Sequence, residues 1–189
     1  MEPSSSVLDL GCGDGELLAL LVKEKGVKAK GIDINEQAIH ECIAKGLSVL
    51  HGDIDEGLLD YADKSFDYVI LNQTFQQLRK PDAVLREALR VGKEAIVSFP
   101  NFAHFSARLQ IFFAGRTPVT QSLPHKWYDT PNLHFLSISD FVEYCKMRNI
   151  HIKRAEFVSG DRKIHMFPNL LALVGIFLIT GGQTGRLEG

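Results

Sequence analysis

A glycine-rich loop that follows a short apolar segment holds the residues best suited to bind a small ligand. Asp9 lies inside the apolar run from Val7 to Leu10, and Gly11 and Gly13 follow it directly. Glycines at such a turn allow the backbone to approach a ligand closely, because no Cβ intervenes. The helix expected next would direct free N–H groups and a positive dipole end toward the same point. Since a buried aspartate needs a partner, Asp9 indicates a ligand with a positive charge.

Polar residues also follow three further segments that are typical of buried strands. Asp33 comes 22 residues after Gly11 and is placed to accept hydrogen bonds from both hydroxyls of a ribose. Asp53 follows the third strand, where it could hold an adenine amino group. Because parallel strands end at one edge of a sheet, four strand ends would meet at one ligand. The residues expected to bind it are Asp9, Gly11, Cys12, Gly13, Asp33, Ile34, Asp53, Ile54, Asn72 and Gln73.

S-adenosylmethionine is the ligand that fits this pattern, since it carries a sulfonium and an ammonium but no phosphate. Enzymes that bind dinucleotides place a similar glycine loop at the same point, so the glycines alone do not decide between the two. Here Glu16 stands where the nicotinamide fingerprint requires glycine or alanine, and Asp9 would repel a pyrophosphate. A nicotinamide oxidoreductase is therefore the disfavoured alternative.

Several of these residues also have structural interpretations. Asp33 could instead cap the following helix, and Cys12 could be a small residue tolerated in a tight loop, since no base for a nucleophilic thiol is evident. If an acceptor needs deprotonation, four side chains are candidate bases. Lone residues of these types in loops are more often structural, so we assign no catalytic residue. The four candidates are His104, His125, His134 and Tyr128.

Apolar runs and helical patterns alternate along the chain and predict an α/β fold. Strands are expected at 7–10, 28–33, 48–51, 66–71, 93–99, 150–158 and about 171–180. Helices are expected at 14–25, 35–45, 81–90, around 102–113 and at 139–148. This alternation predicts a doubly wound, mostly parallel, seven-stranded Rossmann-like sheet with helices on both faces. One domain should cover residues 1–180, and a flexible tail should follow at 181–189.

The segment at about 115–135 is long for a simple connection and has neither a helical nor a strand period. It contains three prolines, two histidines, Trp127 and Tyr128. Aromatic residues often anchor interfaces, and long loops often close over substrates. The composition therefore leaves two interpretations open, a docking surface for another protein or a lid packed on its own domain.

The overall composition is that of an ordinary folded protein. Of the 189 residues, 45% are hydrophobic and 23% are charged, and a formal net charge of −2 gives no reason to expect nucleic acid or an anionic membrane as a partner. The three cysteines are widely spaced and form no CxxC pair, which argues against a disulfide framework or a zinc site. A reducing, cytoplasmic environment is therefore expected, with no metal centre.

The sequence resembles the class I S-adenosylmethionine-dependent methyltransferases and, over roughly residues 6–180, the MetW family of methionine-biosynthesis proteins. The resemblance is carried by LDLGCGDGELL (8–18), YVILNQTFQQ (68–77), SFPNF (98–102) and LPHKWYDTPN (123–132). The last two strings are more specific to the family than the glycine loop. Methyltransferases usually carry a helix before the first strand that helps to cover the cofactor, whereas here only residues 1–6 precede it. We therefore expect a more open cofactor site.

This resemblance implies a methyltransferase-like sheet, S-adenosylmethionine as cofactor and a link to methionine supply. It also implies an association with homoserine O-acyltransferase, the enzyme that activates homoserine. Two functions follow as hypotheses. The chain is a methyltransferase with an unknown acceptor, or it is a partner subunit, non-catalytic or sensing S-adenosylmethionine, that activates the acyltransferase.

Overall fold

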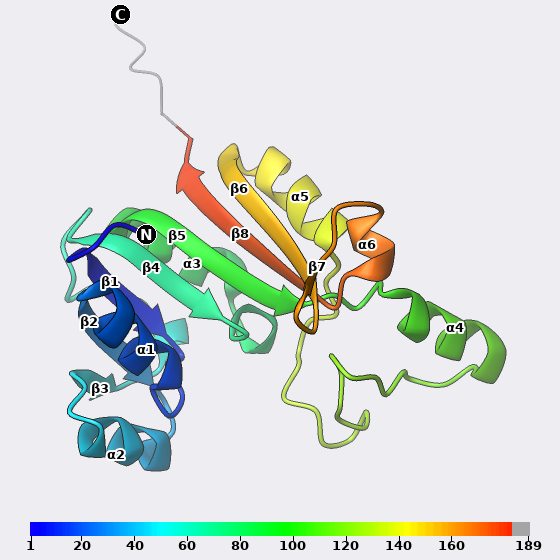
Figure 1. Cartoon of the computed structure of the whole chain (residues 1–189), viewed down its shortest axis with the longest axis horizontal. Coiled ribbons are helices and arrows are strands. Elements are labelled where there is room, and N and C mark those ends of the chain that lie inside the picture. Colours follow the sequence, from blue (N-terminus) through cyan, green and yellow to red (C-terminus); the bar gives the residue numbers. More distant parts are fainter. Residues whose placement is uncertain (183–189) are drawn as a thin grey trace, which may run out of the picture.

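The computed structural model describes residues 1–182, which form one mixed β-sheet with helices on both faces (Figure 1). In this part of the chain the strands are β1 (Ser6–Leu10), β2 (Lys28–Asp33), β3 (Val49–His51), β4 (Phe66–Asn72), β5 (Gly92–Pro100), β6 (Ile150–Ser159), β7 (Arg162–Lys163) and β8 (Val174–Gly181). They lie in the order β3-β2-β1-β4-β5-β8-β6-β7. The strands from β1 to β5 pair in parallel, whereas β8 runs antiparallel to both β5 and β6.

The predicted α/β fold and its mostly parallel sheet are confirmed. All seven predicted strands are present, and the only addition among residues 1–182 is β7, which forms a short hairpin with β6. With two residues, β7 is too short to show a period in the sequence. Gly181 belongs to β8, and the remainder of the predicted tail, residues 183–189, lies outside the described part of the chain.

Helices pack on the two faces of the sheet through separate apolar clusters. The α-helices are α1 (Glu16–Lys25), α2 (Glu36–Ala44), α3 (Pro81–Val91), α4 (Phe105–Ala114), α5 (Ile138–Met147) and α6 (Pro168–Leu171), and the 3-10 helices are η1 (Ile54–Glu56) and η2 (Phe75–Gln77). On one face, Leu18 of α1 and Cys42 of α2 are buried beside Cys12. On the other, Leu85 of α3 and Phe141 of α5 join the main core. The first five strands and these helices place the ends of β1 to β4 at one edge.

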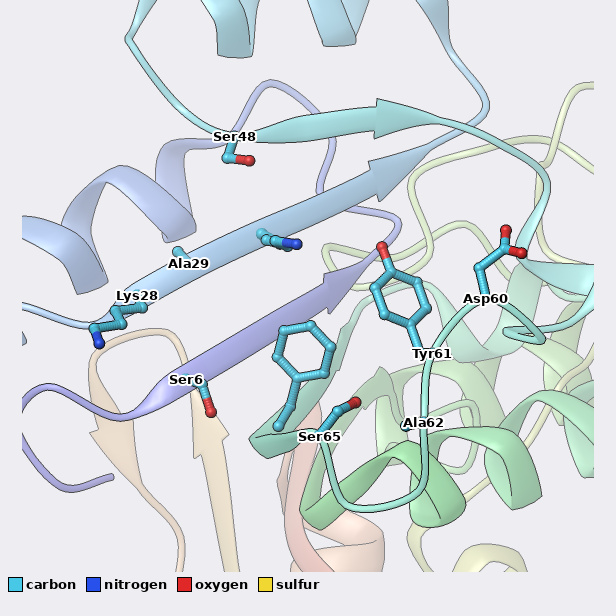
Figure 2. A pocket seen from close by; sticks show the side chains of 10 residues that line it. Ser6, Lys28, Ala29, Ser48, Asp60, Tyr61, Ala62 and Ser65 are labelled. Carbon is cyan, nitrogen blue, oxygen red and sulfur yellow. The ribbon is translucent and has the colours of Figure 1, made fainter.

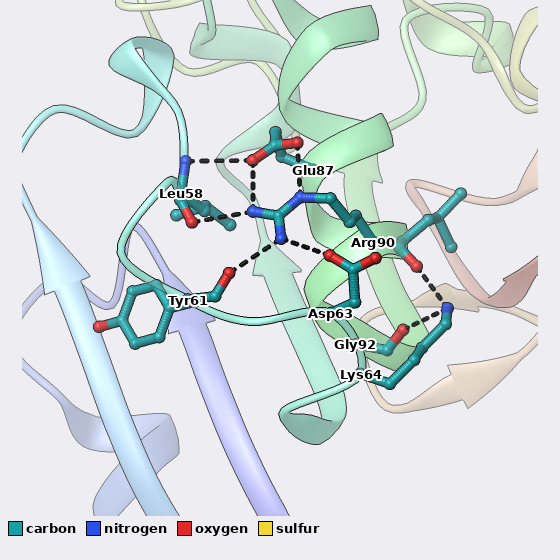
Figure 3. Close-up of polar contacts among 8 residues, drawn as sticks. Leu58, Tyr61, Asp63, Lys64, Glu87, Arg90 and Gly92 are labelled. Carbon is teal, nitrogen blue, oxygen red and sulfur yellow. Dashed lines mark hydrogen bonds and ion pairs between the residues drawn. The ribbon is translucent and has the colours of Figure 1, made fainter.

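The connection between β3 and β4 contains η1 but no α-helix, which is unusual for a parallel crossover. Arg90 of α3 holds this connection in place (Figure 3). Its guanidinium donates to the carbonyl oxygens of Leu58 at 2.9 Å and Tyr61 at 2.8 Å. It also forms ion pairs with Asp63 and Glu87, both at 2.8 Å. Five N–H donors in one plane allow a single arginine to order the part of this connection that follows η1 and has no α-helix.

Candidate functional site

The carboxyl ends of β1, β2, β3 and β4 enclose a cavity of about 650 Å³, which is within the usual range for ligand pockets. This edge is the point at which the chain crosses from β3 back to β4, so the connections diverge there and leave room for a ligand. Eight of the ten residues predicted to bind the ligand line this cavity. They are Gly11, Gly13, Asp33, Ile34, Asp53, Ile54, Asn72 and Gln73.

Asp33 is the residue that organises the glycine loop. One carboxylate oxygen accepts from the backbone N–H of Gly13 at 2.7 Å, and the other accepts from the N–H of Asn35 at 2.8 Å. The alternative that Asp33 caps α2 is wrong, because Asn35 is the N-cap and its side chain accepts from Gln37 and Ala38. A carboxylate has about four acceptor positions, so Asp33 retains capacity for ligand hydroxyls.

Asp9 lies in β1 below the loop and is almost completely buried, with 1% of its surface exposed. Its Oδ1 atom has no hydrogen-bond partner among the described residues. Burial, followed by the negative charge of Asp33, raises the pKa of Asp9 from its ordinary value to about 7. The carboxylate therefore lacks the partner that its charged form requires. Asp9 is not among the residues that line the cavity, and its contact with a ligand stays a prediction.

Cys12 departs from the prediction that it faces the ligand. Its thiol is buried with Leu18 and Cys42 on the side of the sheet covered by α1 and α2, and it is not among the residues that line the cavity. Burial raises the pKa of this thiol well above its ordinary range, which favours the protonated, unreactive form. These contacts favour the structural interpretation that the sequence left open, in which Cys12 is a small residue that fits a tight loop.

Gly13 and Gly15 of the loop have different structural roles. A Cβ on Gly13 (φ +54°) would meet nothing within 4 Å and would point into open space, whereas a Cβ on Gly15 (φ +78°) would lie 2.5 Å from Leu47 Cδ1 and 2.7 Å from Cys42 Sγ. Gly13 thus leaves the backbone accessible to a ligand, and Gly15 allows α1 to pack against α2.

We expect Gly15→Ala to lower the free energy of unfolding by about 3 kcal/mol, because left-handed strain adds to overpacking. Gly13→Ala should cost about 1 kcal/mol, since it has only the left-handed strain. Urea unfolding of the two variants measures this difference. An equal loss of stability in both would show that Gly15 is not tightly packed.

Arg79 is a residue of this cavity that the sequence did not reveal. Its side chain pairs with Asp53 and lies 3.4 Å from Asp55, and its backbone N–H donates to Asp55 at 3.0 Å. The second oxygen of Asp53 accepts from the backbone N–H of Asp55 at 2.9 Å. Both oxygens of Asp53 are therefore engaged. No signal connects residues 26 positions apart in the sequence, so only the folded chain brings Arg79 to Asp53.

The floor beside β4 and β5 is built from uncharged polar groups. Ser98 donates to the side-chain oxygen of Asn72 at 2.6 Å, and the backbone N–H of Gln73 lies 3.2 Å from the Ser98 hydroxyl. Gln73 adopts a left-handed backbone conformation, φ +60°, which is uncommon for a residue with a side chain. Such conformations cluster at functional sites.

None of the four candidate bases lines the cavity. The His104 ring caps α4 and contacts Ser106, and burial lowers its pKa. His134 contacts the carbonyl oxygen of Leu78 at 2.9 Å, whereas the Tyr128 side chain is exposed. His125 lies in a small hollow beside Trp127 and Phe135. Among the described residues, therefore, the lining of this cavity includes no histidine or tyrosine.

A second hollow, of about 470 Å³, lies between the β3–β4 connection, which contributes Asp60, Tyr61 and Ala62, and the first residues of the neighbouring strands (Figure 2). Ser6, Lys28 and Phe66 line it, and they lie where β1, β2 and β4 begin. It contains none of the predicted ligand residues. Because ligands of such sheets bind beyond the carboxyl ends of the strands, the cavity at Asp33 is the stronger candidate.

Within residues 1–182, no group of three or more histidine, cysteine or acidic side chains is placed to hold a metal ion. The three cysteines are all free and buried. In the same part of the chain, no helix has the length and apolar character needed to span a membrane.

Comparison with solved structures establishes the fold. An S-adenosylmethionine-dependent methyltransferase from Archaeoglobus fulgidus matches with a TM-score of 0.66 at 19% identity, covering 93% of this chain and 85% of that chain. Another from Mesorhizobium loti matches with a TM-score of 0.68 at 16% identity, covering 94% and 91% of the two chains. The chain therefore has the fold of class I methyltransferases.

Comparison of sequences establishes the family. The model of the family described as methionine biosynthesis protein MetW matches residues 1–179. The bifunctional methionine biosynthesis protein MetXA/MetW of Rhodopirellula baltica is 34% identical over 174 residues, which cover 87% of this chain and 28% of that protein. Ribosomal protein L11 methyltransferase of Burkholderia lata is 35% identical over 100 residues, which cover 52% of this chain and 33% of the enzyme. The chain thus spans a third or less of these two relatives, and it belongs to the MetW family of methionine-biosynthesis proteins.

Proposed function

We propose that this chain binds S-adenosylmethionine in the cavity at the carboxyl ends of β1 to β4 and transfers its methyl group to an acceptor. The observation that carries the proposal is the arrangement of Asp33, which holds the glycine loop through Gly13 and borders the cavity. The orphaned oxygen of Asp9 and the open space above Gly13 fit the amino-acid end of the cofactor. Ile34, exposed at the cavity, offers an apolar surface to adenine.

Methyl transfer requires little from acidic or basic side chains. The acceptor attacks the methyl carbon in line, the carbon–sulfur bond breaks, and S-adenosylhomocysteine leaves with the electron pair on sulfur. Positioning and exclusion of water supply much of the rate. Asn72, Gln73 and Leu133 form a wall of amide and apolar groups. We therefore expect an acceptor whose attacking atom is already nucleophilic and needs no deprotonation by this wall.

Titration calorimetry with S-adenosylmethionine and S-adenosylhomocysteine tests the binding step, with NADH as the control ligand. We expect both adenosyl compounds to bind at one site and NADH to give no heat. Release of S-adenosylhomocysteine in the presence of a nucleophilic metabolite would establish turnover. Binding of NADH in preference to S-adenosylhomocysteine would contradict the proposal.

A second function is favoured by the relative in which MetXA and MetW form one polypeptide. We propose that this chain also serves as a partner subunit of homoserine O-acyltransferase and that it activates that enzyme. A cavity lining without histidine or tyrosine, as found among residues 1–182, is compatible with this role. Assay of the acyltransferase with and without this chain tests it, and an unchanged rate would exclude activation.

Arg79→Ala should tighten the binding of S-adenosylhomocysteine two- to fivefold. The substitution frees one oxygen of Asp53 for the adenine amino group, and the gain is small because Arg79 is largely exposed and its ion pair is weak in water. Calorimetry measures the change, with Arg86→Ala, which removes an exposed ion pair on α3, as the control. Weaker binding by the Arg79 variant would show instead that the guanidinium contacts the ligand.

A further inference from the structure

Residues 105–135 form the most apolar exposed region of the described chain, and we name them the 105–135 surface. In Figure 1, α4 projects from the end of β5 away from the sheet, and the following loop runs beside it. Only Ala107 of the helix is buried. Phe112 and Phe113 expose 80% and 78% of their surfaces. The large apolar side chains exposed here are Phe105, Leu109, Ile111, Phe112, Phe113, Val119, Trp127, Tyr128, Leu133 and Phe135.

This concentration of exposed apolar surface requires an explanation. A ten-residue helix is marginally stable in water by itself, and packing of an apolar face normally stabilises it. A concentration of large exposed apolar side chains marks interaction sites. Aromatic residues are typical of the centre of an interface, and this surface exposes Trp127 and the consecutive pair Phe112 and Phe113. We therefore expect a binding partner to cover the 105–135 surface.

The charged residues of the 105–135 surface indicate what kind of partner it would bind. The 105–135 surface carries Arg108, Arg116 and Lys126 but only one acidic residue, Asp129, although the whole chain has a net charge of −2. Opposite potentials across an interface favour association. The partner should therefore present an apolar face with an acidic rim.

The end of the 105–135 surface also reaches the proposed cofactor cavity. The backbone N–H groups of Leu133 and His134 donate to the carbonyl oxygen of Gln76 at 2.9 Å and 3.0 Å. The His134 ring contacts the carbonyl oxygen of Leu78 at 2.9 Å. Leu133 and Leu78 both line the cavity. A partner that orders residues 105–135 would thus also order one wall of the cofactor site.

We infer that the 105–135 surface docks the homoserine O-acyltransferase subunit and that docking is coupled to binding of S-adenosylmethionine through Leu133 and His134. This inference rests on the partner function proposed above, for which the fused relative is the support: it carries the MetXA part in the same polypeptide as its MetW part. Coupling is reciprocal, so each ligand should raise the affinity for the other by the same factor.

The test measures binding of this chain to the separately purified acyltransferase of the same organism by calorimetry. The double variant Phe112→Ser/Phe113→Ser removes the two most exposed side chains of α4 without touching the core. The matched control is Leu50→Ser/Leu59→Ser, which removes two exposed leucines near the β3–β4 connection. We expect the α4 variant to bind at least tenfold more weakly and the control to bind as the unmodified chain does.

Affinity for S-adenosylhomocysteine in the absence of the acyltransferase should be the same in all three proteins, which shows that the fold and the cofactor site are intact. Saturating S-adenosylhomocysteine should tighten the complex at least threefold. An unchanged complex affinity would overturn the coupling. If S-adenosylhomocysteine does not bind at all, the proposed cofactor function and the coupling fail together, and the docking result is judged by the two double variants alone.

Three results would overturn the docking surface. The first is an acyltransferase complex of equal affinity with the α4 variant, and the second is no complex with the unmodified chain. The third is a different occupant of the surface. In that case the acyltransferase does not bind, but the unmodified chain self-associates in sedimentation or binds vesicles of phosphatidylserine and phosphatidylcholine. The α4 variant then loses that self-association or vesicle binding.

Discussion

Asp33→Ala should weaken the binding of S-adenosylhomocysteine at least 100-fold in calorimetric titration. The carboxylate would accept both ribose hydroxyls while its bonds to Gly13 at 2.7 Å and Asn35 at 2.8 Å keep the glycine loop and the start of α2 in position. Hydrogen bonds to a charged group contribute about 1.5–3 kcal/mol each, so the loss of two corresponds to roughly 100-fold or more in affinity.

Two further variants make this experiment specific. Asp33→Asn retains one acceptor oxygen and should lose less affinity than alanine does. Glu24→Ala removes an acidic residue of α1 that lies outside the cavity, and it should bind as the unmodified chain does. Circular dichroism establishes that each variant is folded. A folded Asp33→Ala protein with an affinity within threefold of the original would contradict the proposed site.

Asp9→Asn should stabilise the protein above pH 7 and weaken cofactor binding at the same time. The pKa of Asp9 is about 7 in the folded chain and about 4 when unfolded, so the folded state binds the extra proton between these values. The free energy of unfolding therefore falls as pH rises from 4 to 7, by about 4 kcal/mol from this residue. Asparagine does not ionise, so the variant does not lose this free energy of unfolding as pH rises. Burial of the asparagine amide without partners costs about 1–3 kcal/mol.

Urea unfolding at pH 8 should accordingly show Asp9→Asn to be more stable than the original chain by about 1–3 kcal/mol. At pH 4 the order should reverse, with Asp9→Asn less stable by about 1–3 kcal/mol, because Asp9 is then protonated and only the burial cost of the asparagine remains. A variant that is less stable at pH 8 would mean that the buried carboxylate already has a strong partner.

Asp9→Asn should bind the ligand more weakly than the original chain, although it is the more stable protein above pH 7. Affinity for S-adenosylhomocysteine should rise between pH 5.5 and 7.5 in the original chain, because the ionised Asp9 attracts the ligand ammonium. Asp9→Asn should bind at least tenfold more weakly at pH 7.5 and lose this dependence on pH. A retained pH dependence in the variant would assign it to another group.

Much of the fold could be predicted from the sequence, because it depends on local patterns. Apolar runs that end in glycine, aspartate or asparagine indicated β1, β2 and β4, and helical spacing with Gly26 at the end indicated α1. In a parallel sheet the carboxyl ends share one edge, so the positions of Asp33, Asp53 and Asn72 after their strands were enough to bring them to one cavity.

Other features depend on contacts between distant residues, which a local pattern does not contain. The orientation of Cys12 away from the cavity follows from the packing of its thiol, together with Leu18 of α1, on Gly31, where no Cβ fits. The pairing of Arg79 with Asp53 requires the segment after η2 to meet the start of η1 at the cavity. The position of β8 between β5 and β6 is likewise a matter of sheet order rather than of its own residues.

The sequence by itself determined the fold class, the glycine loop and the residues at the strand ends, since strand and helix periods, turn glycines and parallel strand direction are short-range properties. Only the tertiary structure decided which of these residues face the cavity, how far burial shifts the pKa of Asp9, and that α4 leaves the sheet with Phe112 and Phe113 exposed. The physical reason is that burial and side-chain partners are set by what packs against a residue, and those neighbours come from distant parts of the chain.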